Sequence, residues 1–246
     1  MLARDLRQAL DPVAFCRDRL QLELDPQQAR LVRARAHRAL VNCTRQWGKS
    51  TTTAIAALHE GAYRPGSKTI VLSPTQRQSS LLLAKVQVFA ERAKIAAKPL
   101  GGEDPGLRLP AGVLVALPGS EATTRGFDAC TWLILDEAAR VPDALFYAAR
   151  AYIATTNGRM SLLSTLFGKR GFFWKEYESG RWEVTSVPAT ECPRISAEFL
   201  AEQRASMPES WFRQEYLCEF TSVDEGVFDH DLVLDALSSE VEPLCL

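Results

Sequence analysis

The chain has 246 residues, of which 46% are hydrophobic and 24% charged, and its formal net charge is −1. These values are typical of a folded soluble protein and exclude collagen-like, coiled-coil and disordered chains. No apolar run approaches the roughly 18 residues that a membrane-spanning helix needs, and the charged N-terminus lacks the apolar segment of a secretory signal. We therefore expect a cytoplasmic protein with one large domain, or one domain with a small appendage.

Helices and strands are expected to alternate along the chain. Residues 1–35 are predicted to be helical, because they contain two Asp-Pro pairs of the kind that starts helices. Further helices are expected at 51–63, 79–94 and 142–154. Short apolar and β-branched runs predict strands at 39–43, 68–73, 113–119, 132–137, 158–165 and, as an edge strand, 182–188. This alternation predicts an α/β fold with a largely parallel sheet.

The distribution of charge divides the chain near Pro188. Residues 1–182 carry a net charge of +10, whereas residues 183–246 hold three basic and fourteen acidic side chains, a net charge of −11. The acidic last quarter is expected to form two short helices that dock onto the basic body or onto another protein. We therefore predict a core domain over residues 1–188 and a small helical subdomain over 189–246.

A phosphate-binding loop is expected between the first strand and the helix that follows it. The general pattern is GxxxxGK[ST]; Gly48, Lys49 and Ser50 match its last three positions, whereas Cys43 occupies the position of its first glycine. In such a loop, backbone N–H groups surround the phosphates, the lysine reaches the β- and γ-phosphate oxygens, and the hydroxyl holds Mg²⁺. A Gly-Lys-Ser triplet also occurs by chance, but the strand before it and the helix after it favour the binding role.

A second candidate is the acidic pair Asp136-Glu137, which ends an apolar strand. Parallel sheets bind ligands at the carboxyl ends of their strands. Asp136 can coordinate Mg²⁺ through the water shell of the metal, and Glu137 can orient and deprotonate an attacking water. The alternative is an acidic first turn of a helix, which the upstream Lys49 and Ser50 make the weaker interpretation.

Other polar residues could complete a nucleotide site. Ser164 and Thr165 end the next strand, where hydroxyl groups can sense a γ-phosphate, although they would also suit a plain strand end. Gln28 lies upstream of the loop, at a spacing from which its amide could read the edge of adenine.

Arginines near the loop could offset the charge that phosphoryl transfer builds on the phosphate oxygens. Arg45 lies within the loop, Arg125 precedes the acidic strand and Arg140 follows it. Each of them alone could instead be a solvated surface residue.

Together these segments resemble the large terminase subunit of tailed bacteriophages, the motor that packages DNA. RQWGKS, ATTRGFDACTWLILDEAA and LLSTLFGKRGFF carry the resemblance, which covers residues 22–230. An arginine in the loop and no leading glycine are typical of that family, so Cys43 fits it. The resemblance implies a P-loop NTPase fold (RecA-like, ASCE type), with a mostly parallel sheet flanked by helices and a small helical C-terminal linker subdomain.

The resemblance also implies roles for individual residues. Lys49 and Ser50 of the Walker A motif would bind phosphate and Mg²⁺. In the Walker B pair, Asp136 would hold the metal and Glu137 would be catalytic. Leu166 departs from the proline that is common after Ser-Thr in the coupling motif. The other implied site residues are the coupling Ser164 and Thr165, the adenine-contacting Gln28, the loop residues Gln46, Trp47, Gly48 and Thr51, and the catalytic arginines Arg45 and Arg125, the last of which some members supply to a neighbouring subunit.

By the same resemblance, we expect a motor ATPase that uses ATP and Mg²⁺ to translocate double-stranded DNA into a procapsid. The implied partners are DNA, a portal protein, the small terminase subunit and further copies of the chain in a pentameric ring. In isolation the chain could be a monomer; no membrane is involved, and the compartment would be the host cytoplasm. Large terminases usually continue into an RNase H-like nuclease, which we expect to be absent here. Basic residues such as Arg77, Lys169 and Arg170 could contact DNA.

Two other functions remain open. A helicase-like, nucleic-acid-dependent ATPase would share the glutamine, the phosphate loop and the acidic pair, but it needs a second RecA-like domain, for which residues 183–246 are too few. A degenerate P-loop module would bind nucleotide or a partner without turnover, and the intact lysine, serine and acidic pair argue against it.

Overall fold

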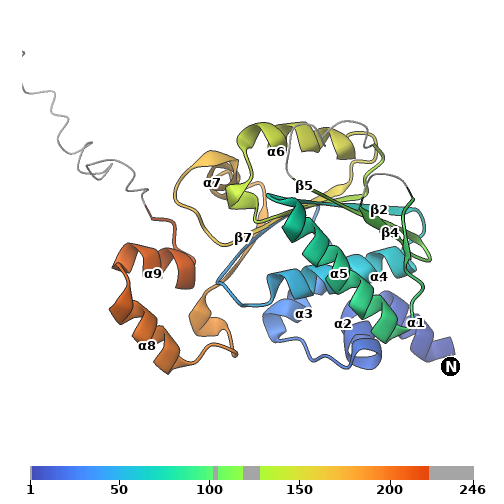
Figure 1. The fold of residues 1–246 in the computed structure, drawn as a ribbon, viewed down its shortest axis with the longest axis horizontal. Coiled ribbons are helices and arrows are strands. Elements are labelled where there is room, and N and C mark those ends of the chain that lie inside the picture. The colour runs from blue at the N-terminus through green and yellow to red at the C-terminus, as the bar shows by residue number, and fades with distance from the viewer. Residues whose placement is uncertain (1, 102–104, 119–127, 222–246) are drawn as a thin grey trace, which may run out of the picture.

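The computed structural model describes residues 2–101, 105–118 and 128–221. Within these ranges, eight strands form one sheet in the order β3-β4-β5-β2-β6-β7-β1-β8 (Figure 1). The strands are β1 (Arg38–Cys43), β2 (Ser67–Ser73), β3 (Lys98–Pro99), β4 (Gly106–Arg108), β5 (Gly112–Pro118), β6 (Trp132–Asp136), β7 (Arg159–Ser164) and β8 (Glu183–Val187). The helices are α1 (Leu2–Leu10), α2 (Pro12–Phe15), α3 (Pro26–Arg33), α4 (Lys49–Tyr63), α5 (Gln76–Ala93), α6 (Asp143–Ala149), α7 (Gly171–Glu178), α8 (Ala197–Ser206) and α9 (Glu209–Tyr216).

The sheet is parallel from β5 to β8, which confirms the predicted α/β fold. β7 lies between β1 and β6, so one strand separates the strand before the phosphate loop from the strand before the acidic pair. Because all three strands run in the same direction, their carboxyl ends meet at one edge of the sheet. This order therefore brings the predicted loop, the acidic pair and the Ser-Thr pair together.

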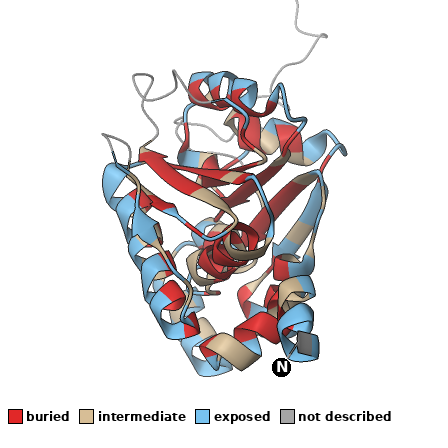
Figure 2. Ribbon diagram, turned by 90° about the vertical axis from the view of Figure 1, so that its right-hand side faces the viewer, coloured by how far each residue is buried: buried red, intermediate tan, exposed pale blue. Residues whose placement is uncertain are grey.

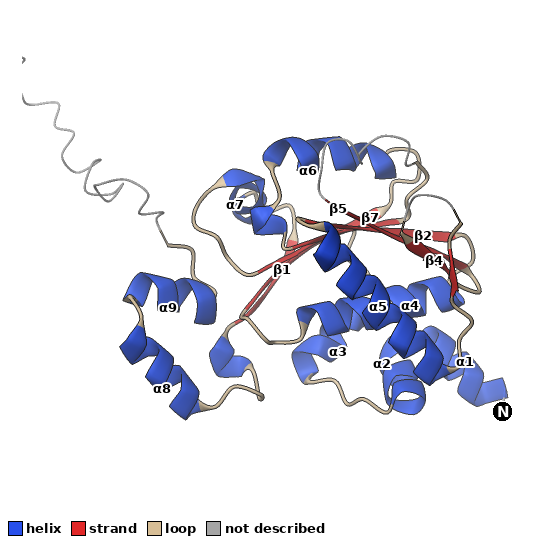
Figure 3. Ribbon diagram, viewed as in Figure 1, coloured by secondary structure: helices blue, strands red, loops and turns tan. Residues whose placement is uncertain are grey.

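Helices cover both faces of the sheet, and each layer encloses a core (Figure 3). Helices α2 to α5 pack on one face around Phe15, Trp47 and Ile55. Helices α6 and α7 pack on the other, where the rings of Phe146 and Phe172 stack with their centroids 4.0 Å apart. The central strands are buried from both sides (Figure 2), which explains their almost continuous apolar sequences.

The six predicted strands are all present, and the structure adds two. β3 and β4 are only two and three residues long and run antiparallel to their neighbours. Both strands are too short to show an apolar pattern, and their proline and glycine residues are uncommon in strands. Helix α7 was not predicted either, because its aromatic residues carry no clear helical spacing.

Helices α8 and α9, which follow the last strand, contact each other and lie to one side of the sheet and of the helices that cover it (Figure 1). The predicted boundary at residue 188 falls directly after β8, and α8 and α9 are the two short helices expected beyond it. The division into two domains stays a prediction, and residues 222–246 lie outside the described ranges. None of the described helices combines the length and the apolar character that crossing a membrane requires.

His59 of α4 is expected to make the stability of the fold depend on pH. Its ring is buried, with Nε2 2.9 Å from the carbonyl oxygen of Gln8. Burial lowers the pKa of His59 below its ordinary 6.5, although the contact with Gln8 acts in the opposite direction. His59 therefore binds a proton more readily in the unfolded chain than in the native protein. The contribution of His59 to the free energy of unfolding should be constant above pH 7 and fall as the pH drops below about 6.5.

Urea denaturation at several pH values between 5 and 8 measures this effect. His59→Gln should remove part of the loss at low pH, whereas the matched replacement of the exposed His37 should not. Equal effects of the two variants would contradict the assignment to His59.

Candidate active site

The segment between β1 and α4 has the backbone of a phosphate loop. Gly48 adopts a left-handed conformation with φ of 100°, and a Cβ there would lie 2.7 Å from Nε2 of Gln28. Only glycine meets both conditions without strain. Helix α4 begins directly after it, and the N–H of Thr52 donates to the carbonyl of Gly48 at 2.9 Å. Free backbone N–H groups in this turn can therefore face an anion.

Cys43 explains why the loop does without its usual first glycine. It is the last residue of β1 and pairs with Val187 of β8, so this position belongs to the sheet and needs no unusual backbone conformation. Burial raises the pKa of its thiol to about 12, which keeps the group neutral. We interpret Cys43 as a packing residue.

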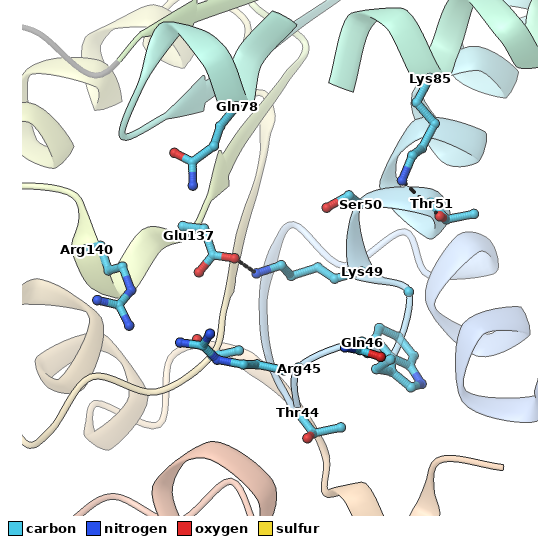
Figure 4. A pocket seen from close by; sticks show the side chains of 13 residues that line it. Thr44, Arg45, Gln46, Lys49, Ser50, Thr51, Gln78, Lys85, Glu137 and Arg140 are labelled. Atoms are coloured by element: carbon cyan, nitrogen blue, oxygen red, sulfur yellow. Dashed lines mark hydrogen bonds and ion pairs between the residues drawn. The ribbon is translucent and has the colours of Figure 1, made fainter. Parts of the chain in front are cut away.

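A cavity of about 490 Å³ opens over the loop (Figure 4). It collects residues from four segments of the chain that are far apart in sequence. These are Thr44, Arg45, Gln46, Trp47, Gly48, Lys49, Ser50 and Thr51 from the loop and α4, Gln78 and Lys85 from α5, Glu137 and Arg140 after β6, and Thr165 after β7. The cavity holds most of the predicted site, and its position at the strand ends agrees with the topology.

Lys49 and the acidic pair form a buried charged cluster at the floor of this cavity. Nζ of Lys49 lies 2.5 Å from Oε1 of Glu137 and 3.6 Å from Oδ1 of Asp136. Lys49 and Asp136 are only 8% and 6% exposed. Burial alone would lower the pKa of Lys49, but the two carboxylates outweigh it and raise that pKa, so the ammonium stays charged. Burial raises the pKa of Asp136, and Lys49 offsets only part of that shift.

The Ser-Thr pair lies between the loop and the acidic pair, at the end of β7. Ser164 is buried, and its Oγ accepts a hydrogen bond of 3.2 Å from the N–H of Ala139, two residues after Glu137. Thr165 lines the cavity, and the following Leu166 is buried in the second core. The pair is thus linked to the segment that carries the acidic residues.

Gln28 and the buried side chain of Trp47 support the loop from behind. The Gln28 side chain donates to the carbonyl of Trp47 at 2.9 Å and accepts from the N–H of Asp25 at 3.2 Å. Both ends of its amide are thus engaged, and it does not line the cavity, so the adenine contact stays a prediction. The Trp47 side chain is 0% exposed and packs in the first core. Arg194, after β8, also donates to the Trp47 carbonyl and pairs with Asp25 at 2.9 Å.

The predicted arginines have different surroundings. Arg45 is paired with Glu215 of α9 by contacts of 2.5 and 3.4 Å, and this hydrogen bonding raises the pKa of Arg45. Thr44 Oγ1 donates to the carbonyl of the same Glu215 at 3.1 Å, so α9 contacts the loop directly. Arg140 lines the cavity. Arg125 lies outside the described residues.

Sequence reasoning missed several residues of this site. Gln78 and Lys85 line the cavity, and Nζ of Lys85 lies 3.2 Å from Oγ1 of Thr51. The sequence did contain evidence for these two residues, because they follow the carboxyl end of a parallel strand, β2, at the ligand-binding edge. Arg194 and Glu215 had no such signal, since each meets the loop from well over 100 residues away.

Comparison with known proteins identifies the fold. No family model and no curated protein matches the sequence. The structure is similar to the large terminase ATPase domain of Thermus phage P74-26 (TM-score 0.74, 20% identity, 86% of this chain and 100% of that one). It is also similar to the large terminase of a thermophilic bacteriophage (TM-score 0.70, 10% identity, 85% and 57%) and to that of bacteriophage HK97 (TM-score 0.67, 18% identity, 87% and 55%).

The second of these three terminases has also been solved with ADP and with ATP-γ-S. This chain matches the whole of one ATPase domain but little more than half of the two longer terminases. Its fold is the P-loop NTPase fold of phage large terminase ATPase domains.

Proposed function

We propose that this chain is the ATPase motor of a phage DNA-packaging machine, which hydrolyses ATP to translocate double-stranded DNA into a procapsid. The observation that carries the proposal is the buried cluster of Lys49, Asp136 and Glu137 beneath a phosphate loop. A lysine that contacts two carboxylates in the wall of a cavity suits the binding of phosphate and the activation of water. The fold shared with terminase ATPase domains agrees with it.

The residues fit Mg²⁺ as a cofactor of ATP. Oδ1 of Asp136 is fully buried and has no hydrogen-bond partner among the described residues. An unsatisfied carboxylate oxygen in this position suits a hydrated cation, because hard cations bind oxygen. Asp136 and the hydroxyl of Ser50, which lines the cavity, would hold the ion. Bound Mg²⁺ would neutralise charge on the β- and γ-phosphates.

The protein residues would act on the nucleotide in sequence. N–H groups of the loop and the Lys49 ammonium bind the phosphates. The γ-phosphate competes for Lys49 and thereby releases Glu137 from its 2.5 Å contact. Glu137 then accepts a proton from the attacking water, whose oxygen bonds to the γ-phosphorus as the bond to the ADP oxygen breaks. Thr165, which lines the cavity, would sense the loss of the γ-phosphate.

The motor would work as part of an assembly in the host cytoplasm. We propose a pentameric ring on the procapsid, in contact with the portal protein and the small terminase subunit, in which Arg125 completes the site of a neighbouring copy. DNA phosphates would be held by basic side chains, for which Arg77, Lys169 and Arg170 are candidates. Such contacts are sequence-independent and weaken as salt is added.

Turnover of ATP by the Glu137→Gln variant tests the proposed function. The substitution keeps the size of the side chain but removes the proton acceptor, so we expect turnover to fall by about 100-fold or more while ATP still binds. The exposed Glu178 offers a matched control, and Glu178→Gln should behave as the wild type. Full turnover by Glu137→Gln would contradict the role of Glu137. A specific rate that rises with protein concentration would support the contribution of a neighbouring copy.

A further inference from the structure

The two arginines of the cavity differ in what their guanidinium groups contact. The charge of Arg45 is offset by Glu215, which accepts two hydrogen bonds from it. Arg140 has no carboxylate partner within the described ranges; its guanidinium lies over the ring of Phe167, with Cζ 4.3 Å from the ring centroid. A guanidinium held over an aromatic ring can still donate its N–H groups to an oxygen acceptor. Arg140 can therefore donate hydrogen bonds to a phosphate.

Phe167 is well placed to hold Arg140. It is half-buried, lies two residues after Thr165, and its ring also carries the guanidinium of Arg170, with Cζ 3.9 Å from the centroid. The backbone beyond it is fixed to the C-terminal helical segment, since the N–H of Gly168 donates to the Gln214 side chain at 2.9 Å. The backbone of Phe167 is thus fixed on both sides: Thr165 before it lines the cavity, and Gly168 after it is bonded to α9.

Arg140 also lies close to the reacting end of the cavity. It follows Glu137 by one turn of 3₁₀-helix, and Figure 4 shows both on the same side of the cavity as Arg45, with Ser50 and Lys85 opposite. Of the other cations, Lys49 contacts the acidic pair, with which the phosphates must compete, and Lys85 donates to the hydroxyl of Thr51. Negative charge that builds on the γ-phosphate oxygens would find the donors of Arg140 uncommitted.

We propose that Arg140 is the catalytic arginine that this chain supplies to the γ-phosphate of its own nucleotide, and that Phe167 is the positioning residue that orients it. The inference rests on the proposed ATPase function. It assigns the charge-stabilising contact to a residue of the same chain, in addition to any arginine that a neighbouring copy contributes. It also predicts that Arg140 distinguishes ATP from ADP, because only ATP carries the group that it contacts.

The first test combines steady-state ATP turnover with equilibrium titration by ADP and by ATP-γ-S. We expect Arg140→Ala to lower kcat by roughly 1,000-fold, the lower end of the range for catalytic arginines, with the Kd for ADP changed by less than about twofold. The Kd for ATP-γ-S should approach that for ADP. Arg150→Ala is the matched control, because Arg150 also lies over a phenylalanine, Phe146, but outside the cavity.

Phe167 is tested by its own pair of variants. Phe167→Leu removes the aromatic face and should lower kcat by roughly tenfold without changing the Kd for ADP. Phe167→Tyr keeps the aromatic ring and should retain the kcat of the wild type. A merely structural role for the loop would not predict this difference between the two variants.

The outcomes separate this inference from the proposed function. Wild-type turnover that Glu137→Gln abolishes supports the ATPase, and an unchanged kcat in Arg140→Ala would then overturn the role of Arg140 alone. A parallel loss of ADP and ATP-γ-S affinity would also overturn it, since it would mean general attraction of phosphate. If the wild type shows no turnover, the ATPase proposal fails, and the titrations still decide whether Arg140 reads the γ-phosphate.

Discussion

Replacing Lys49 with alanine is expected to abolish ATP turnover and to destabilise the protein. The ammonium group lies 2.5 Å from Glu137 and 3.6 Å from Asp136, and it is the cation that offsets these two carboxylates. Its loss leaves the buried Asp136 with an uncompensated charge, which costs about 3–5 kcal/mol of unfolding free energy when one partner of a buried pair is removed. It also removes the cation that holds the β- and γ-phosphates.

The pH dependence of this loss identifies its cause. Burial already raises the pKa of Asp136, and without Lys49 that pKa must rise further. Protonation at low pH removes the uncompensated charge, so the difference in unfolding free energy between variant and wild type should shrink as the pH falls from 8 to 5. Urea denaturation across this range measures it. Lys85→Ala is the control, because Lys85 lines the same cavity outside the charged cluster. A difference that is independent of pH would contradict the explanation.

The parts of this site that sequence reasoning predicted share one physical property. Strands buried on both faces are apolar throughout, so β1, β6 and β7 are visible as short apolar runs. Parallel strands place their carboxyl ends at one edge, so the polar residues that follow these runs must converge. Lys49, Glu137 and Thr165 do converge in the cavity. Apolar runs, strand direction and the phosphate-loop motif were therefore sufficient to predict these three residues.

The parts that were missed depend on side chains that meet across the fold. The contact of Arg45 with Glu215 joins residues 170 positions apart, and that of Arg194 with Trp47 joins residues 147 apart. Neither leaves a local pattern, because any exposed arginine could make such a contact. Gln28 shows the same limit: its position upstream of the loop was recognised, whereas the direction of its amide was decided by the capping box with Asp25. Spacing can place a residue near a site without fixing what its polar atoms bind.

Trp47 lies inside the phosphate loop, where a side chain could contact the nucleotide, and yet it is 0% exposed. Its substitution can therefore distinguish a packing role from a ligand-binding role. Trp47→Ala would leave a cavity in the first core and should lower the unfolding free energy by about 3–5 kcal/mol. Trp47→Phe keeps most of the packing and removes an indole N–H that is buried without a partner among the described residues, so its cost should stay below about 1.5 kcal/mol.

Denaturation curves together with ATP-γ-S titrations distinguish the two roles of Trp47. If the ring only packs, Trp47→Phe binds ATP-γ-S as the wild type does. Trp47→Ala then loses affinity for ATP-γ-S only to the extent that the missing ring lets the loop shift. Gln28 and Arg194 both donate to the backbone carbonyl of residue 47, and these two contacts remain in place. Weaker binding by Trp47→Phe at unchanged stability would instead mean that the indole turns out of the core to contact the nucleotide, and that the loop rearranges when it binds.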